Sequence, residues 1–140
     1  MNEPTTINGG ISFDDRGSVS FVNDFDFSDV KRFYYISNIR KNYIRAWHGH
    51  EKEGKFFLAT LGQFRVGAVN LETDELQVRY LNGAKPQILY IPPGYANGLQ
   101  NLTEDNNLMV FSTSTLKESL GDDIRFPWDK WDIWGMEDYR

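Results

Sequence analysis

Both histidines of the chain lie in one short stretch, His48-Gly49-His50. If this stretch is a β-strand, residues two apart point to the same face, so the two imidazoles share one side of a sheet. Arg45 precedes the pair and Lys55 follows it, which places two fixed cations nearby. Imidazoles titrate near neutral pH, and beside cations they can move a proton on an anionic substrate. The alternative is that both histidines are surface residues of a loop.

The composition excludes several other classes of protein. The chain has 140 residues, of which 40% are hydrophobic and 25% charged, as expected for one globular domain with its own core. A formal net charge of −5 argues against nucleic-acid binding. The lack of cysteine excludes disulfides and cysteine-based metal sites and fits a reducing compartment. With no signal peptide and no apolar run long enough for a membrane span, we expect a cytoplasmic protein.

Short β-prone segments separated by turn residues make up most of the chain. Alternating or apolar patterns predict strands at residues 18–22, 31–36, 43–50, 55–61, 63–70, 76–81, 88–91 and 108–112. Residues 1–10 are expected to be a frayed or edge-pairing tail, and residues 115–120 a short helix. The pattern predicts one all-β domain over residues 1–140, a sandwich or barrel with an aromatic C-terminal tail from about residue 122.

Two stretches resemble the paired motifs of the cupin fold, a small β-barrel of the jelly-roll type. The first cupin motif is usually HxH, three or four residues, Glu, six residues and Gly. Here His48-Gly49-His50 is followed by Lys55 in the place of the Glu. The second is usually PxG, two residues, His, three residues and Asn, and here Pro92-Pro93-Gly94 is followed by Asn97 and Asn101. The resemblance implies a single cupin-type jelly-roll barrel.

The departures from these motifs fall on the metal ligands. A cupin metal site uses both histidines, the Glu and the second-motif His, but Lys55 and Asn97 occupy the last two positions. An ammonium repels a divalent ion, and two imidazoles fall short of the three protein ligands usual for a catalytic metal. We therefore expect no metal and no other cofactor. Metal-dependent chemistry, such as that of a cupin dioxygenase, is the disfavoured alternative.

A metal-free cupin with lysine at this position resembles the dTDP-4-dehydrorhamnose 3,5-epimerase family. It is also similar to the shorter dTDP-4-keto-6-deoxyglucose 3,4-ketoisomerases. Asp15-Arg16-Gly17 matches the DxRG-type opening of both. The epimerase motifs RGLH, GKLV…G and WIPPGFAHG and its closing region resemble the stretches that begin at Arg45, Gly54, Tyr90 and Asp123. The ketoisomerase motifs KRVYYI and HAH resemble residues 31–36 and 48–50.

The resemblance implies that the enzyme removes a proton beside the keto group of a 4-keto sugar. His48 matches the epimerase base, and Lys55 and Arg45 match groups near the keto oxygen. In the ketoisomerases the second histidine of the pair is the important one, which is His50 here. A histidine suits the base, and a cation near the C4 oxygen stabilises the enolate. Both histidines remain candidates for the base.

A nucleotide-sugar substrate also needs groups for its diphosphate and its base. Arg16 matches a family position that contacts the nucleotide, and Arg65 matches an arginine of the ketoisomerases; the alternative for each is a solvated surface side chain. Tyr34 and Tyr95 are candidates for stacking on the base, with core packing as the alternative. Asn97 completes the predicted substrate-binding residues.

These observations predict a metal-independent epimerase of a nucleotide-linked 4-keto-6-deoxy sugar, and the resemblance implies a homodimer. A 3,4-ketoisomerase is the alternative on the same scaffold, because the epimerase tyrosine acid is missing near residues 113–116, and the family Asp is missing near Val66. A sugar-binding cupin without catalysis is the third hypothesis. The carboxylate partner of the family's catalytic histidine comes from a longer C-terminal region, for which this chain offers Asp129, Asp132, Glu137 and Asp138.

Overall fold

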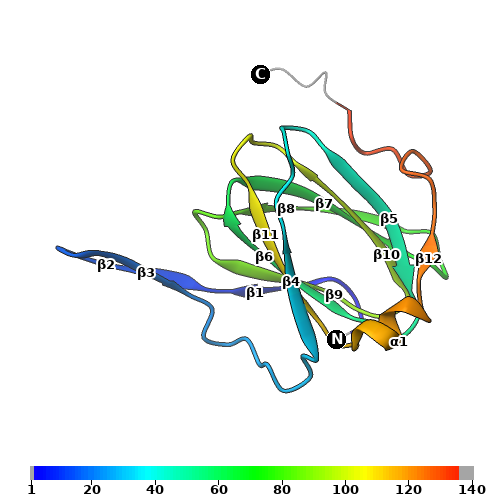
Figure 1. The fold of residues 1–140 in the computed structure, drawn as a ribbon, viewed down its shortest axis with the longest axis horizontal. Coiled ribbons are helices and arrows are strands. Elements are labelled where there is room, and N and C mark those ends of the chain that lie inside the picture. The colour runs from blue at the N-terminus through cyan, green and yellow to red at the C-terminus, as the bar shows by residue number, and fades with distance from the viewer. Residues whose placement is uncertain (1, 136–140) are drawn as a thin grey trace.

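Two antiparallel five-stranded sheets face each other in the computed structural model, which describes residues 2–135 (Figure 1). The first sheet has the order β1 (Thr5–Asn8), β9 (Gln87–Ile91), β6 (Lys55–Leu61), β11 (Asn107–Ser112) and β4 (Arg32–Ile36). The second has the order β12 (Ile124–Arg125), β5 (Ile44–His50), β10 (Tyr95–Asn101), β7 (Gln63–Asn70) and β8 (Leu76–Asn82). This arrangement confirms the predicted all-β jelly roll.

The core lies between the sheets because alternate residues of each strand point inward. In β11, Leu108 and Val110 are fully buried, while Met109 between them is only partly buried. They pack in one cluster with Phe57 of the same sheet, Phe64 of the opposing sheet and other inward-facing residues. The sequence pattern predicted no full strand at β10, yet all seven of its residues are buried.

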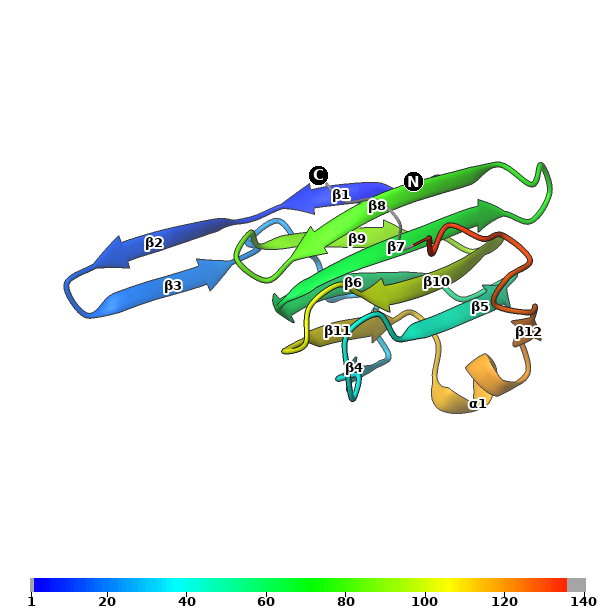
Figure 2. The same ribbon diagram turned by 90° about the horizontal axis from the view of Figure 1, so that it is seen from above.

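The hairpin of β2 (Gly10–Asp14) and β3 (Gly17–Phe21) projects away from the barrel and pairs only with itself within residues 2–135 (Figure 2). Its apolar side chains are exposed, Phe13 at 75% and Val19 at 66%. The preceding strand β1 pairs with β9, so the edge-pairing alternative for the N-terminal tail is correct.

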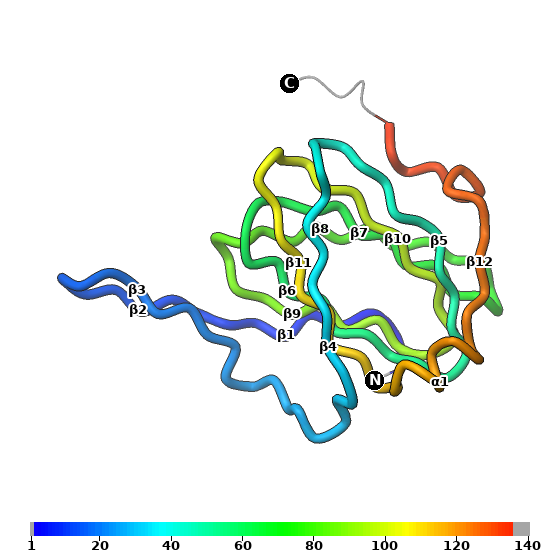
Figure 3. Tube along the Cα trace, viewed as in Figure 1, coloured from blue at the N-terminus to red at the C-terminus, as the bar shows by residue number. Residues whose placement is uncertain are grey.

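A short helix and an ordered segment follow the last long strand. The short helix predicted for residues 115–120 is α1 (Leu116–Leu120), which begins with a capping box of Thr115 and Glu118. The chain then forms β12 and continues along the outer side of β5 (Figure 3), where Trp131 and Trp134 pack on the buried Trp47. The predicted tail is thus part of the fold up to residue 135; residues 136–140 lie outside the described residues.

No helix within residues 2–135 has the length and apolar character needed to cross a membrane.

Candidate active site

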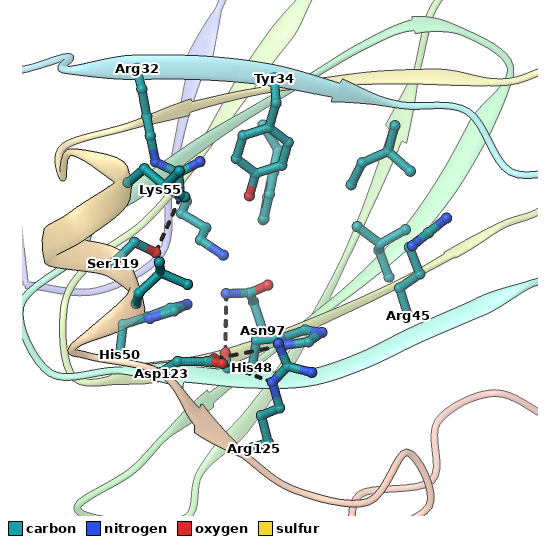
Figure 4. Close-up of a pocket in the computed structure, with 15 residues that line it drawn as sticks. Arg32, Tyr34, Arg45, His48, His50, Lys55, Asn97, Ser119, Asp123 and Arg125 are labelled. Atoms are coloured by element: carbon teal, nitrogen blue, oxygen red, sulfur yellow. Dashed lines mark hydrogen bonds and ion pairs between the residues drawn. The ribbon is translucent and has the colours of Figure 1, made fainter.

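A cavity of about 390 Å³ opens between the two sheets beside α1 (Figure 4). It is lined mainly by ionisable or polar side chains from both sheets and by apolar residues at its edges. The ionisable and polar residues are Arg32, Tyr34, Arg45, His48, His50, Lys55, Asn97, Ser119, Asp123 and Arg125. All four predicted catalytic residues are among them, and so are Tyr34 and Asn97 from the predicted substrate-binding set.

A β-bulge in β5 brings Arg45 to the same face as the histidines. His48 pairs with Asn97, but the next pair joins Ala46 to Gly98, so Trp47 is an extra residue in β5. The extra residue shifts the alternation of side chains, and residues 45 and 48 both line the cavity although they are three apart. Trp47 points to the outer side of the sheet, where it is fully buried against the C-terminal segment.

The surroundings of His50 determine which of its ring nitrogens carries a proton. Its Nδ1 lies 2.8 Å from the backbone oxygen of Asp122 and 3.4 Å from Oε1 of Glu53. Both partners are acceptors, so Nδ1 donates and the neutral imidazole has its lone pair on Nε2. Nε2 is buried without a hydrogen-bond partner among the described residues. This nitrogen is therefore available as a base on a side chain that is only 4% exposed.

Burial and the neighbouring cations favour the neutral forms of the two histidines, although nearby carboxylates act in the opposite direction. Burial lowers the pKa of His50 below its usual value, and the ammonium of Lys55 lowers it further. Burial also lowers the pKa of His48, again with a contribution from Lys55 and another from Arg125. Burial in turn lowers the pKa of Lys55, which is 8% exposed. Neutral imidazoles can accept a proton from a substrate, so both histidines are prepared to act as bases.

Each histidine also has a carboxylate neighbour that the sequence reasoning missed. Asp123 Oδ1 lies 4.0 Å from Nδ1 of His48, and Arg125 donates a 2.7 Å hydrogen bond to the other oxygen of Asp123. Burial opposes ionisation of Asp123, but Arg125 and the imidazoles hold its pKa below the usual value. Glu53 is the neighbour of His50.

Of the carboxylates that the C-terminal segment offers, neither Asp129 nor Asp132 lies beside a histidine in the described structure. Asp132 instead accepts a hydrogen bond from the backbone of Trp134, and Asp129 does not line the cavity. Glu137 and Asp138 lie outside the described residues. The signal for Asp123 was its place at the start of the Asp-Ile-Arg stretch that resembles the epimerase closing region. No local pattern marked Glu53, which lies in a polar turn.

Tyr34 reaches into the cavity from β4, on the side opposite the histidines (Figure 4). Its hydroxyl points toward the space that Lys55 and Asn97 also face. Burial raises the pKa of Tyr34 to about 12, so the hydroxyl keeps its proton at neutral pH and can donate it. Asn97 is held in place because its Nδ2 donates to the backbone oxygen of His48 at 3.3 Å.

The structure places the other three predicted substrate-binding residues outside this cavity. Arg16 lies at the tip of the β2–β3 hairpin, where it pairs with Asp14 at the exposed surface. Arg65 has the opposite strand parity to the buried Phe64, so it faces outward and donates to Gln100 Oε1 at 3.0 Å. Tyr95 is 7% exposed and belongs to the core, which matches the core-packing alternative.

Within residues 2–135, no group of three or more His, Cys, Asp or Glu side chains is arranged to hold a metal ion. The expected lack of a cofactor stays a prediction.

Residues 6–125 match the family model described as "FdtA: WxcM-like, C-terminal". The chain belongs to this family. A search of curated proteins with this chain found no match.

Solved structures with the same fold include enzymes of both classes that the sequence resembled. The FdtA-family chain is 24% identical to the sugar 3,4-ketoisomerase QdtA from Thermoanaerobacterium thermosaccharolyticum, solved with TDP; the TM-score is 0.73, with 94% of this chain and 91% of that one covered. It is 21% identical to the TDP-quinovose 3,4-ketoisomerase WlaRB from Campylobacter jejuni (TM-score 0.72; 90% and 95% covered). It is 15% identical to the RmlC epimerase of Mycobacterium tuberculosis (TM-score 0.74; 87% and 68% covered).

Proposed function

We propose that the protein is a 3,4-ketoisomerase of a dTDP-linked 4-keto-6-deoxy sugar. The observation that carries this proposal is that Nε2 of His50 is buried and has no hydrogen-bond partner within residues 2–135, in a cavity that also holds the ammonium of Lys55. A base and a cation together supply what proton transfer beside a keto group requires. Membership of the FdtA family and the fold shared with TDP-sugar isomerases support the sequence-based prediction of an isomerase.

The lengths of the structural relatives favour the ketoisomerase over the epimerase that the sequence analysis ranked first. The chain covers 91% of QdtA and 95% of WlaRB, but only 68% of the RmlC epimerase. The place where the epimerases carry a tyrosine acid is occupied by residues with other roles. Thr113, for example, accepts a hydrogen bond from the backbone of Gly54 and does not line the cavity.

In the proposed reaction, Nε2 of His50 takes the proton from C3 of the sugar. The electron pair of that C–H bond forms the C3–C4 double bond, and the C4 oxygen becomes an anion stabilised by the ammonium of Lys55. His50 then returns a proton to C4 while the C3 hydroxyl loses its proton and becomes the new carbonyl. The C4 oxygen takes up a proton in exchange. The sugar is neither oxidised nor reduced overall.

Two arginines in the cavity are suited to the diphosphate of the substrate. Nε of Arg45 donates to Oδ1 of the buried Asn38 at 2.7 Å, which fixes the guanidinium in place. Arg125 lies on β12 and donates a hydrogen bond to Asp123, which precedes that strand. Planar guanidinium groups bind phosphate oxygens in a bidentate manner. These residues replace Arg65 in the proposed site, while Arg16, which lies outside this cavity, stays a prediction.

One observation favours a second candidate, an epimerase. The Tyr34 hydroxyl faces the cavity from the side opposite the two histidines. An epimerase removes a proton on one face of the sugar ring and supplies one on the other. Tyr34 would then be the acid that the sequence analysis sought near residues 113–116.

Proton NMR of the protein with dTDP-4-keto-6-deoxyglucose in heavy water tests the proposal. Appearance of a 3-keto sugar is the expected result. Deuterium at C3 or C5 with the keto group still at C4 would make the protein an epimerase and overturn the proposal. An unchanged sugar that nevertheless binds would leave the sugar-binding hypothesis. His50→Asn is expected to abolish the transfer, with His48→Asn as the matched variant on the same strand face.

A further inference from the structure

Glu53 is a carboxylate buried in the wall of the site, although it does not line the cavity itself. The residue is 2% exposed and its side chain is fully buried. It follows β5 by three residues, in the turn before β6. A buried carboxylate without partners is costly, so the groups around Glu53 must satisfy its oxygens.

Four side chains from different elements meet these oxygens. Ser119 of α1 donates to Oε1 at 2.7 Å, and Nδ1 of His50 lies 3.4 Å from the same oxygen. Ser112 of β11 donates to Oε2, and NH2 of Arg32 on β4 lies 3.4 Å from it. Arg32 also donates to Ser119 Oγ at 3.1 Å, which closes the network. Glu53 therefore connects the base to α1, to the edge strand β4 of the first sheet and to the neighbouring strand β11.

The geometry gives Glu53 two effects on His50. As an acceptor beside Nδ1, it supports the form of the ring whose free lone pair is on Nε2. As an anion, it favours the imidazolium that forms when Nε2 takes a proton, and so it raises the pKa of His50 against burial and Lys55. Two further carboxylates lie near this imidazole, those of Asp122 and Asp123 in the short connection between α1 and β12.

Asp122 supports the same ring from the other direction. Its backbone oxygen accepts from Nδ1 of His50, and its carboxylate accepts from the backbone N–H groups of Glu51, Lys52 and Glu53. These three bonds fix the turn that carries Glu53. Asp122 therefore holds the ring through its backbone oxygen and fixes the turn, and Glu53 adds a second acceptor beside Nδ1 and a buried negative charge.

We propose that Glu53 is a positioning residue for His50, which holds the ring with Nε2 toward the substrate and stabilises its protonated state. The inference rests on the proposed function, because it assigns His50 the role of the base. Glu53 does not touch the substrate and acts only through His50 and Arg32.

The test begins with ¹⁵N-histidine NMR of the wild-type protein without substrate. We expect the neutral His50 ring to carry its proton on Nδ1. A ring protonated on Nε2 would overturn the proposal without any variant. This measurement does not depend on turnover, so it stands even if the sugar assay contradicts the proposed function.

The second step compares Glu53→Gln with the matched control Glu51→Gln, which removes an exposed carboxylate from the same turn. In Glu53→Gln the NMR titration of His50 should move to lower pH, and the acidic limb of the kcat/KM profile should move with it. Turnover should fall about tenfold or more, but by less than the roughly 10²–10⁴-fold lost with a general base itself. Glu51→Gln should match the wild type in all three measurements.

A lower turnover in Glu53→Gln with an unmoved His50 titration would show a merely structural role and overturn the proposal. If Glu53→Gln fails to fold, Ser119→Ala keeps the carboxylate and removes one of its restraints. The His50 titration should then stay near that of the wild type while turnover falls. The opposite result is a His50 titration in Ser119→Ala that moves to the low pH of a buried imidazole with no carboxylate beside it. That result would contradict the assignment of the charge effect to Glu53.

Discussion

Replacement of Lys55 by methionine should separate activity from stability. The ammonium of Lys55 is the buried cation of the cavity, and in the proposed reaction it stabilises the anionic C4 oxygen. Loss of one such group at an oxyanion typically lowers kcat by about 10²–10³-fold, or roughly 2.7–4 kcal/mol of transition-state stabilisation. Lys55→Met should lose turnover in this range, measured by NMR with dTDP-4-keto-6-deoxyglucose.

The same substitution should make the protein more stable at neutral pH. Burial lowers the pKa of Lys55 in the folded state, so at pH 7 the folded protein pays a desolvation cost that methionine does not have. A buried charge that forms no ion pair is costly, so its replacement by an apolar side chain of similar volume should be stabilising. Because the folded protein releases this proton at lower pH than the unfolded chain, the advantage of Lys55→Met should shrink as the pH rises toward 10.5.

Histidine titrations give the third readout of this variant. Lys55 lowers the pKa of both His48 and His50, so both titrations should move to higher pH in Lys55→Met. Lys52→Met, which removes an exposed ammonium three residues earlier, is the matched control and should change none of these properties. Wild-type turnover in Lys55→Met, or histidine titrations that do not move, would refute the placement of this cation at the reacting oxygen.

Three further predictions follow from the same structure. Because burial and Lys55 lower the pKa of His48 and His50, the acidic limb of the kcat/KM profile should lie below pH 6.5, and a limb above 6.5 would contradict the assignment of these bases. The free energy of unfolding should also decrease as the pH falls below 6.5, because the unfolded chain then binds more protons than the folded protein. Arg45→Ala should raise KM by a larger factor than it lowers kcat. A decrease in kcat as large as the increase in KM would argue against diphosphate binding by Arg45. Gly67→Ala should destabilise the fold by about 1–3 kcal/mol in urea unfolding, because the new Cβ would lie 2.4 Å from the ring of the buried Trp47; wild-type stability would show that this ring can move.

The part of the site that could be predicted from the sequence consists of residues that are close along the chain as well as in space. The i, i+2 spacing of His48 and His50 and the motif position of Lys55 were enough to place all three in one cavity. Contacts that depend on the meeting of distant segments were missed. Asp123 reaches His48 only because β12 pairs with β5, a register that no local pattern encodes.

The direction of side chains along a strand explains why Arg65 lies outside the cavity although its strand was predicted correctly. Arg65 lies on a strand that was predicted correctly, but the pattern of β7 alone did not show which of its faces meets the cavity. Phe64 and Val66 occupy the inner face, which directs Arg65 outward. The bulge at Trp47 acted in the opposite sense, since it brought Arg45 onto the histidine face against simple alternation.

The burial of His50 has a consequence for the choice between the two isomerase reactions. Nε2 of His50 is shielded from solvent, so a proton that it takes from C3 exchanges slowly with water and is available for return to the sugar. Return to C4 on the same face completes a ketoisomerisation with one base, whereas epimerisation requires Tyr34 to supply a different proton on the other face. We therefore expect part of the C3 hydrogen to appear at C4 in heavy water, and Tyr34→Phe to reduce this transfer less than His50→Asn does.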